Sequence, residues 1–205
     1  MFGPLEDNCV SLDESRIEDV PQLTAVENDI LVAPFFEKEV FEAISQMKNN
    51  KAPGPDGFPA EFYKKCWHII KGDLLPMFHD LFSGQLQLFQ LNFGTITLLP
   101  KKIEVVRIEK FRPICLFNVS FKIFTKVGTN RLTQIAHSVV QHSQTAFMPD
   151  RNILKGVVVL HETLHEIHTK KLDGVVFKVD FEKAYDKVKW SFLQQAMRMK
   201  GFEEA

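Results

Sequence analysis

Cysteine is scarce in this sequence of 205 residues, and the three cysteines, Cys9, Cys66 and Cys115, lie far apart. An odd number of widely spaced cysteines supports neither a disulfide framework nor a CxxC-type zinc site. Long apolar runs are missing as well, because no stretch approaches the roughly 18 residues that a membrane helix needs. The first residues contain neither a basic region nor an apolar region of the kind found in secretory signals. We therefore expect an intracellular protein, cytoplasmic or nuclear, without membrane contact.

Low-complexity composition is also lacking. Hydrophobic residues make up 45% of the chain and charged residues 25%, which excludes collagen-like and wholly disordered classes. At about 100 to 200 residues per domain, the length allows one domain, or one domain with part of a neighbour.

The net charge of −1 conceals a strong division of charge along the chain. Residues 1–35 contain eight acidic residues against one basic residue and carry −7, so the remainder carries +6. Residues 101–131 contain eight basic and two acidic residues, which also gives +6. This window predicts an anionic partner. The alternative is an ordinary solvated face of charged side chains.

Residues 1–35 have no sustained hydrophobic periodicity, which predicts an acidic linker or arm before a domain over residues 36–205. Apolar residues at helical spacing in that domain place Ile69 and Leu132 among the inward-facing positions. The predicted helices cover residues 36–49, 59–70, 73–83, 119–139, 153–169 and 190–200.

Two short apolar, β-rich runs, residues 95–100 and 111–116, flank a polar segment and predict a long hairpin with basic residues at its shoulders. A further strand is predicted over residues 174–180, with Val175, Phe177 and Val179 on one face. This strand would deliver the carboxylate of Asp180 to a sheet edge.

The residues from His161 to His165 read HETLH, which matches the HExxH zinc-protease pattern. Histidines four apart share a helix face and could hold Zn²⁺, with Glu162 as a base. A third ligand is needed, but Lys171 stands six residues on and Glu182 follows the predicted strand rather than a helix. An ordinary amphipathic helix is the favoured interpretation.

Two other segments have both a functional and a structural interpretation. Asp180 ends a strand and Tyr185 follows five residues later, as a nucleotidyl-transfer site with catalytic Mg²⁺ needs. One carboxylate cannot hold two metals, and Asp180 could equally cap the next helix. The loop KAPGPDGF at residues 51–58 lacks the spacing of a P-loop, and is either a turn beside a phosphate or a plain connection.

Five sequence blocks occur together and in a characteristic order. They are NKAPGPDGFPAEFYK at 50–64, TLLPKK at 97–102, FRPICLFNVSFKIFTKVGTNRL at 111–132, QTAFMPDRNI at 144–153 and FKVDFEKAYDKVKWSFL at 177–193. In this combination the chain closely resembles the reverse transcriptase domain of non-LTR (LINE-type) retrotransposons, most like those of flowering plants. The resemblance covers roughly residues 31–205.

The resemblance implies an α+β fold, the fingers and partial palm of a right-hand polymerase. It implies that Asp180 is the first palm carboxylate and a metal ligand, joined by the backbone carbonyl of Phe181, and that Tyr185 excludes a ribose 2′-OH. The implied cofactor is Mg²⁺ in a two-metal site, and the implied partners are an RNA template, a DNA primer and deoxynucleoside triphosphates. The residues implied to contact the triphosphate are Arg112 and either Lys101 or its neighbour Lys102.

The sequence departs from this family at several positions. Met148 and Asp150 stand where the family usually has Val and Gly, and Cys115 replaces a usual Ser. The paired-aspartate motif of the palm does not occur in the sequence. We therefore expect a fragment of an RNA-directed DNA polymerase that is inactive alone, with non-specific self-association through its apolar strand. The alternative is a non-catalytic remnant that binds RNA or protein.

Overall fold

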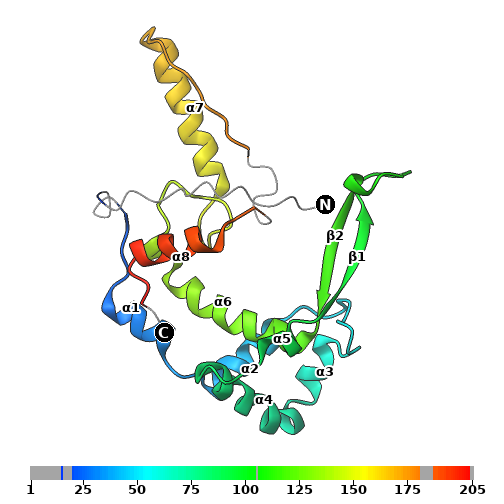
Figure 1. Ribbon diagram of the computed structural model, residues 1–205. Coiled ribbons are helices and arrows are strands. Elements are labelled where there is room, and N and C mark those ends of the chain that lie inside the picture. The colour runs from blue at the N-terminus through cyan, green and yellow to red at the C-terminus, as the bar shows by residue number, and fades with distance from the viewer. Residues whose placement is uncertain (1–14, 16–19, 105, 181–186, 204–205) are drawn as a thin grey trace. The chain divides into compact units, whose positions relative to one another are not determined.

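The computed structural model describes residues 15, 20–104, 106–180 and 187–203. The chain forms two compact units, and their helices and strands are drawn in Figure 1. Unit 1 comprises Met1–Val32 and Thr133–Ala205, and unit 2 comprises Ala33–Leu132. The described elements are mainly α-helical, with one two-stranded sheet. None of the helices within these described ranges is both long enough and apolar enough to cross a membrane.

Unit 2 begins with α2 (Glu37–Gln46), α3 (Ala60–Lys65) and α4 (Trp67–Phe82), which lie in regions predicted to be helical, followed by the short α5 (Leu88–Leu91), which was not predicted. The start of α2 is fixed by Glu39, the third residue of the helix, whose side chain accepts a hydrogen bond from the Phe36 backbone N–H at 2.7 Å. The single helix predicted over residues 59–70 is divided at Cys66. This division changes the inward face, so that Tyr63 is buried whereas Ile69, predicted to face inward, is 67% exposed.

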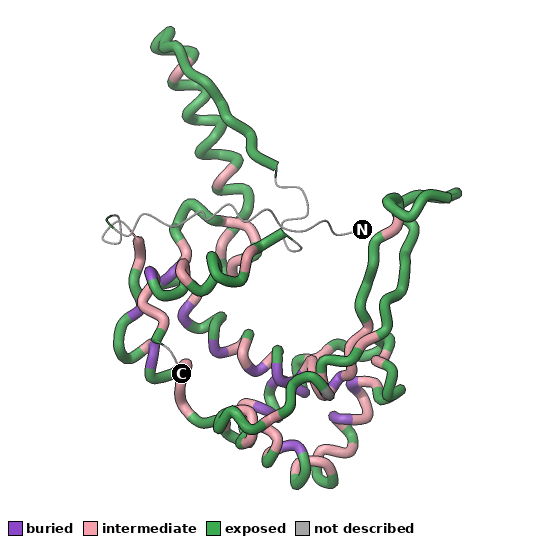
Figure 2. The backbone as a smooth tube through the Cα atoms, viewed as in Figure 1, coloured by how far each residue is buried: buried purple, intermediate pink, exposed green. Residues whose placement is uncertain are grey.

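The predicted hairpin is confirmed. β1 (Gly94–Pro100) pairs antiparallel with β2 (Phe111–Phe117), from Gly94 opposite Phe117 to Pro100 opposite Phe111. A short 3-10 turn, Ile108–Lys110, precedes β2. Most residues of both strands are exposed (Figure 2), so this ribbon extends from unit 2 instead of filling its core.

The helix predicted over residues 119–139 is confirmed as α6 (Val119–Val139). The prediction that Leu132 faces inward is wrong. Leu132 is 45% exposed, while the neighbouring Arg131 is only 7% exposed. Arg131 is buried because its guanidinium forms a double ion pair with Glu39, at 2.9 Å and 2.6 Å, and donates to the carbonyl oxygens of Ala33 and Pro34. Its guanidinium carbon also lies 4.3 Å from the ring centroid of Phe35. Apolar spacing cannot identify a buried position that is satisfied by charge.

The core of unit 2 joins α2, α3, α4 and the first half of α6. The Phe78 and Phe124 rings stack at a centroid distance of 4.2 Å. The buried members are Val40, Ala43, Ile44, Ala60, Tyr63, Leu74, Phe78, Val119, Ile123, Phe124 and Val127.

Unit 1 contains α1 (Ala25–Val32), the last third of α6, α7 (Ile153–Thr169) and α8 (Trp190–Met199). Its small core consists of Leu23, Ile135 and Val139. The helix α1 corrects the expectation that regular structure begins only near residue 36. It was missed because polar bonds fix it as much as apolar packing: the Asn28 amide donates to the Gly201 carbonyl oxygen at 2.6 Å.

The strand predicted over residues 174–180 does not form. These residues are extended and exposed, with Val175 at 90% and Phe177 at 87%. A strand requires a neighbour to satisfy its backbone groups, and no described segment pairs with this one. The preceding helix α7 matches its predicted bounds, with Asn152 as a side-chain cap at 2.9 Å, and contains no buried residue (Figure 2).

Candidate nucleic-acid interface

The far end of the β1–β2 hairpin concentrates exposed positive charge. Pairing places Arg112 opposite Leu99, and the Lys101 backbone N–H continues the ladder by donating to the Lys110 carbonyl oxygen at 2.9 Å. The Lys101 ammonium also donates to the Glu109 carbonyl oxygen at 3.1 Å. The structure therefore brings Lys101, Lys102 and Arg112, predicted to bind triphosphate, to one end of one ribbon. All three are exposed.

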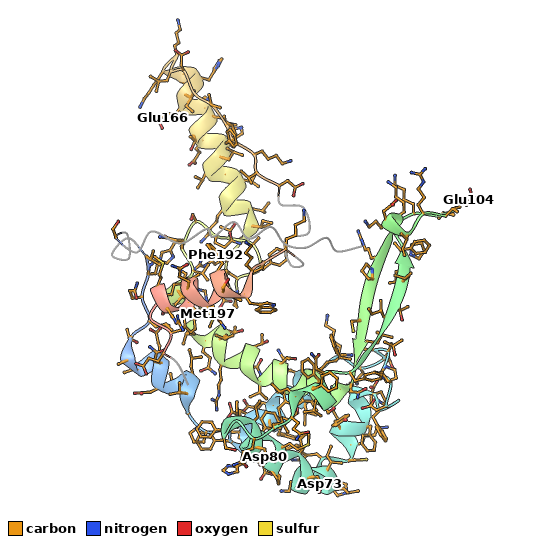
Figure 3. The ribbon with its side chains drawn as sticks, in the orientation of Figure 1. Asp73, Asp80, Glu104, Glu166, Phe192 and Met197 are labelled. Carbon is orange, nitrogen blue, oxygen red and sulfur yellow. The ribbon has the colours of Figure 1, made fainter. Side chains whose placement is uncertain are left out.

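A hollow of about 650 Å³ lies at this end of the hairpin. Its lining residues are Pro100, Lys101, Lys102, Ile103, Glu104 and Phe111. Glu104, labelled in Figure 3, has a φ of +61° and is the one acidic residue among them. Within the described part of the chain, the side chains of Lys102 and Arg112 form no ion pair or hydrogen bond. Their charge is available to an anion from solvent.

Asp180 belongs to unit 1, so the predicted site is described in two parts. Asp180 is exposed and ends the extended segment that follows α7. Phe181 and Tyr185, the other residues predicted at this position, lie outside the described residues. Across the residues that are described, no group of three or more His, Cys, Asp or Glu side chains is arranged to hold a metal ion. The described residues near Asp180 thus do not by themselves form a complete Mg²⁺ site.

The HETLH segment lies on α7, as predicted, with His161, Glu162 and His165 exposed. Thr169 is the neighbour of His165, with 3.5 Å between its hydroxyl and the histidine Nε2. Glu182, considered as a third ligand, lies outside the described residues. Among the described side chains, those of this helix contribute to no cluster that could hold a metal ion.

The KAPGPDGF loop forms a tight turn against the start of α6. A Cβ atom on Gly54 would lie 2.4 Å from the Asn118 backbone nitrogen, so only glycine allows this approach. The Asp56 N–H donates to the Asn118 side-chain oxygen at 3.2 Å, and the Asp56 carboxylate accepts from the Phe58 N–H at 3.0 Å. Burial raises the pKa of the nearby Tyr63, and the charge of Asp56 acts in the same direction. The loop has a definite structural role in joining the N-terminal helices of unit 2 to α6.

The sequence assigned no role to Lys48, and it considered Lys51 only as the first residue of this loop. The two lysines lie at least fifty residues before the basic window, and the fold brings them to a cavity that Lys122 and Lys126 also line. The available signal was the four-residue spacing of Lys122 and Lys126, which places both lysines on one face of α6.

Similarity to known proteins extends over most of the sequence. The model of the family described as "Reverse transcriptase (RNA-dependent DNA polymerase)" matches residues 99–204, which contain both the basic hairpin end and Asp180. A Xenopus laevis protein, "Transposon TX1 uncharacterized 149 kDa protein", is 28% identical over 181 residues, covering 88% of this chain and 14% of that protein.

Two insect retrotransposon proteins are similar over a shorter region. The Pol polyprotein from element R1 of Bradysia coprophila is 23% identical over 155 residues, 74% of this chain and 15% of that protein. The Pol polyprotein from element R2 of Nasonia vitripennis is 25% identical over 150 residues, 73% of this chain and 14% of that protein. The chain therefore spans about a seventh of the length of these curated relatives.

Proposed function

Because the chain belongs to the reverse transcriptase (RNA-dependent DNA polymerase) family and is homologous to non-LTR retrotransposon proteins, we propose that it supplies the fingers and the start of the palm of an RNA-directed DNA polymerase. The observation that carries this proposal is the basic end of the hairpin, within the matched region. We propose residues 36–205 as the polymerase part, with an acidic segment before it whose helix α1 packs within unit 1.

Lys101, Lys102 and Arg112 are proposed to bind the triphosphate of an incoming deoxynucleotide. Their exposure and lack of acidic partners within the described residues support this role. Tyr185 as the residue that excludes a ribose 2′-OH remains a prediction from the family resemblance. The proposed polymer partners are an RNA template and a DNA primer, and the proposed location is the cytoplasm or the nucleus.

Asp180 is proposed as one metal ligand of the polymerase, with the carbonyl of Phe181 beside it. The two-metal site for Mg²⁺ would need the paired aspartates that are absent from these 205 residues. We therefore propose that the chain alone does not extend a primer.

The role of Asp180 is tested in a longer polymerase that carries this segment together with the paired-aspartate motif. Asp180→Asn preserves side-chain size but removes the charge, so primer extension should fall by more than about tenfold. Asp173→Asn is the matched control, because Asp173 is an exposed carboxylate in the same segment, and its activity should stay near wild type. Equal activity of the two variants would contradict the role assigned to Asp180.

A second candidate function is favoured because, among the described residues, Asp180 belongs to no group of three or more His, Cys, Asp or Glu side chains that could hold a metal ion. A chain without polymerase chemistry could still bind RNA through its basic surface. This function predicts that the longer polymerase shows no primer extension even when Asp173 and Asp180 are both unchanged. The 205-residue chain should still bind RNA.

A further inference from the structure

A cavity of about 410 Å³ in unit 2 is lined by four lysines and no acidic residue. It lies where the end of α2 and the following loop face α6. The remaining lining residues are Gln46, Met47, Ala52, Ala60, Val119, Thr125 and Thr129. We refer to the cavity with Lys48, Lys51, Lys122 and Lys126 as the lysine groove.

On the α6 wall of the lysine groove, the lysine ammonium groups are the hydrogen-bond donors that remain available to a ligand. Lys122 and Lys126 are half-buried and lie one helical turn apart. The hydroxyls of Thr125 and Thr129 on the same wall donate to carbonyl oxygens of their own helix, at 3.0 Å and 2.7 Å. A ligand in the groove would therefore be recognised on this wall by positive charge.

The opposite wall is held in place by polar side chains of α3. The Lys64 ammonium donates to the Met47 carbonyl oxygen at 2.5 Å and to the Asn49 side chain at 2.8 Å. The Glu61 carboxylate accepts from the Asn50 N–H at 2.5 Å, and Asn50 adopts a φ of +55°. These contacts fix the segment that carries Lys48 and Lys51. The two lysines are thus positioned by the fold and are not merely on a mobile surface.

Charge balance indicates what the groove binds. None of its four lysines forms an ion pair or side-chain hydrogen bond within the described residues. Like charges gathered around one cavity repel one another, so an anionic ligand would stabilise the arrangement. Unit 2 as a whole contains fourteen basic and nine acidic residues, a formal charge of +5, whereas the entire chain carries −1.

We propose that the lysine groove binds consecutive phosphates of a single-stranded RNA, as a contact additional to the hairpin end. This inference rests on the proposed function, because it identifies a further surface for the same polymeric partner. Lysines neutralise phosphates as point charges and read no base sequence. The contact should therefore be independent of sequence and sensitive to salt.

The test measures fluorescence anisotropy of a labelled oligouridylate with the intact chain. Two charge-removing variants address separate walls, Lys48→Gln/Lys51→Gln and Lys122→Gln/Lys126→Gln. The control is Lys38→Gln/Lys65→Gln, which removes the same charge from exposed lysines of unit 2 outside the groove. Circular dichroism verifies that each variant is folded. If substitution of the half-buried Lys122 and Lys126 unfolds the protein, the variant at the exposed Lys48 and Lys51 still tests the proposal.

Each groove variant should bind at least about tenfold more weakly than the control. Its plot of log affinity against log salt should be shallower by about 1.4, or about 0.7 for each phosphate that the variant no longer neutralises. Affinity equal to that of the control would overturn the proposal. Equally tight binding of a polyglutamate peptide at the same ionic strength would also overturn it, since the groove would then accept any polyanion.

A third variant, Lys101→Gln/Lys102→Gln/Arg112→Gln, separates this proposal from the proposed function. If it alone weakens binding, the groove proposal fails and the nucleic-acid function stands. If the wild-type chain binds no RNA, both fail.

Discussion

Arg131 connects three parts of unit 2 through one side chain. It holds Glu39 at the start of α2 and the carbonyl oxygens of Ala33 and Pro34, and it lies over Phe35. Its side chain is 8% exposed and that of Glu39 is 23% exposed. Removal of the guanidinium would leave a largely buried carboxylate and two carbonyl oxygens without their donor.

Arg131→Ala should therefore lower the free energy of unfolding by about 3 kcal/mol or more. The control is Lys71→Ala, which removes an exposed ion pair with Glu37 at 2.9 Å and should cost less than about 1 kcal/mol. Urea denaturation followed by circular dichroism gives both values. Similar losses in the two variants would show that the Arg131 contacts do not hold unit 2 together.

The glycines of unit 2 provide a matched pair of substitutions. Gly54→Ala places a methyl group 2.4 to 2.5 Å from the backbone of Asn118 and Phe117, so it should destabilise the unit by at least about 1 kcal/mol. Gly128→Ala in α6 meets no atom within 4 Å and should stabilise it by about 0.5–1 kcal/mol. Thermal unfolding measures both. A shift in melting temperature of the same sign in the two variants would be inconsistent with the packing of the loop against α6.

Glu61 gives the stability of unit 2 a defined pH dependence. The Asn50 backbone hydrogen bond is the main cause that lowers the pKa of this carboxyl below its ordinary value of 4.5, and Lys64 and Lys65 act in the same direction. The stabilisation is therefore complete above about pH 4.5 and is lost as the pH falls through the lower pKa of the folded state.

The pH prediction compares wild type with Glu61→Gln between about pH 3 and pH 6. The free energy of unfolding of wild type should fall more steeply at the acid end than that of the variant. Glu27, whose pKa is lowered chiefly by its hydrogen bond with Ser138, contributes equally to both curves. Parallel curves would contradict the role of Glu61.

At the scale of elements, the segment 174–180 is the clearest difference between prediction and structure, because the strand predicted there does not form. Its residues are exposed and no described strand pairs with it. Hydrogen exchange measured by mass spectrometry should show rapid exchange over 174–180 and slow exchange over the buried turns of α6. Strong protection of 174–180 in a monomer would mean that the segment has found a partner strand.

Local patterns were sufficient to predict most elements. The spacing of apolar residues predicted α2, α6 and α8, and the bounds of α7 coincide with the prediction because Asn152 caps its first turn. The failures at Leu132 and over 174–180 share a physical cause, since each depends on a distant contact. Arg131 replaces Leu132 inside because Glu39, far away in sequence, neutralises it. The strand over 174–180 was predicted from its own residues, although pairing requires another segment.

The same distinction applies to the candidate site. The basic hairpin end was predictable for two reasons. Its charged residues are close in sequence, and the two strands are indicated by short apolar, β-rich runs. Lys48 and Lys51 were not, because only the packing of α2 and α3 against α6 brings them to the cavity. The roles of Asp180, Phe181 and Tyr185 came from family resemblance and remain predictions.

At the scale of the whole molecule, charge is unequally distributed between the two units. Unit 2 carries +5 and unit 1 carries −6, and both basic surfaces lie on unit 2. A nucleic acid should therefore bind to unit 2. The salt dependence of its affinity should increase with the number of phosphates that the basic residues neutralise. A remnant that binds only protein would not show this dependence of nucleic-acid affinity on salt concentration.

The most direct test of the account is the salt dependence of binding between this chain and an RNA template annealed to a DNA primer with a single-stranded template overhang. If four to six phosphates are neutralised, log affinity should fall linearly with log salt at a slope of about −3 to −5. Absence of binding, or an affinity that does not change with salt, would contradict the central claim that unit 2 is the nucleic-acid-binding part of a reverse transcriptase.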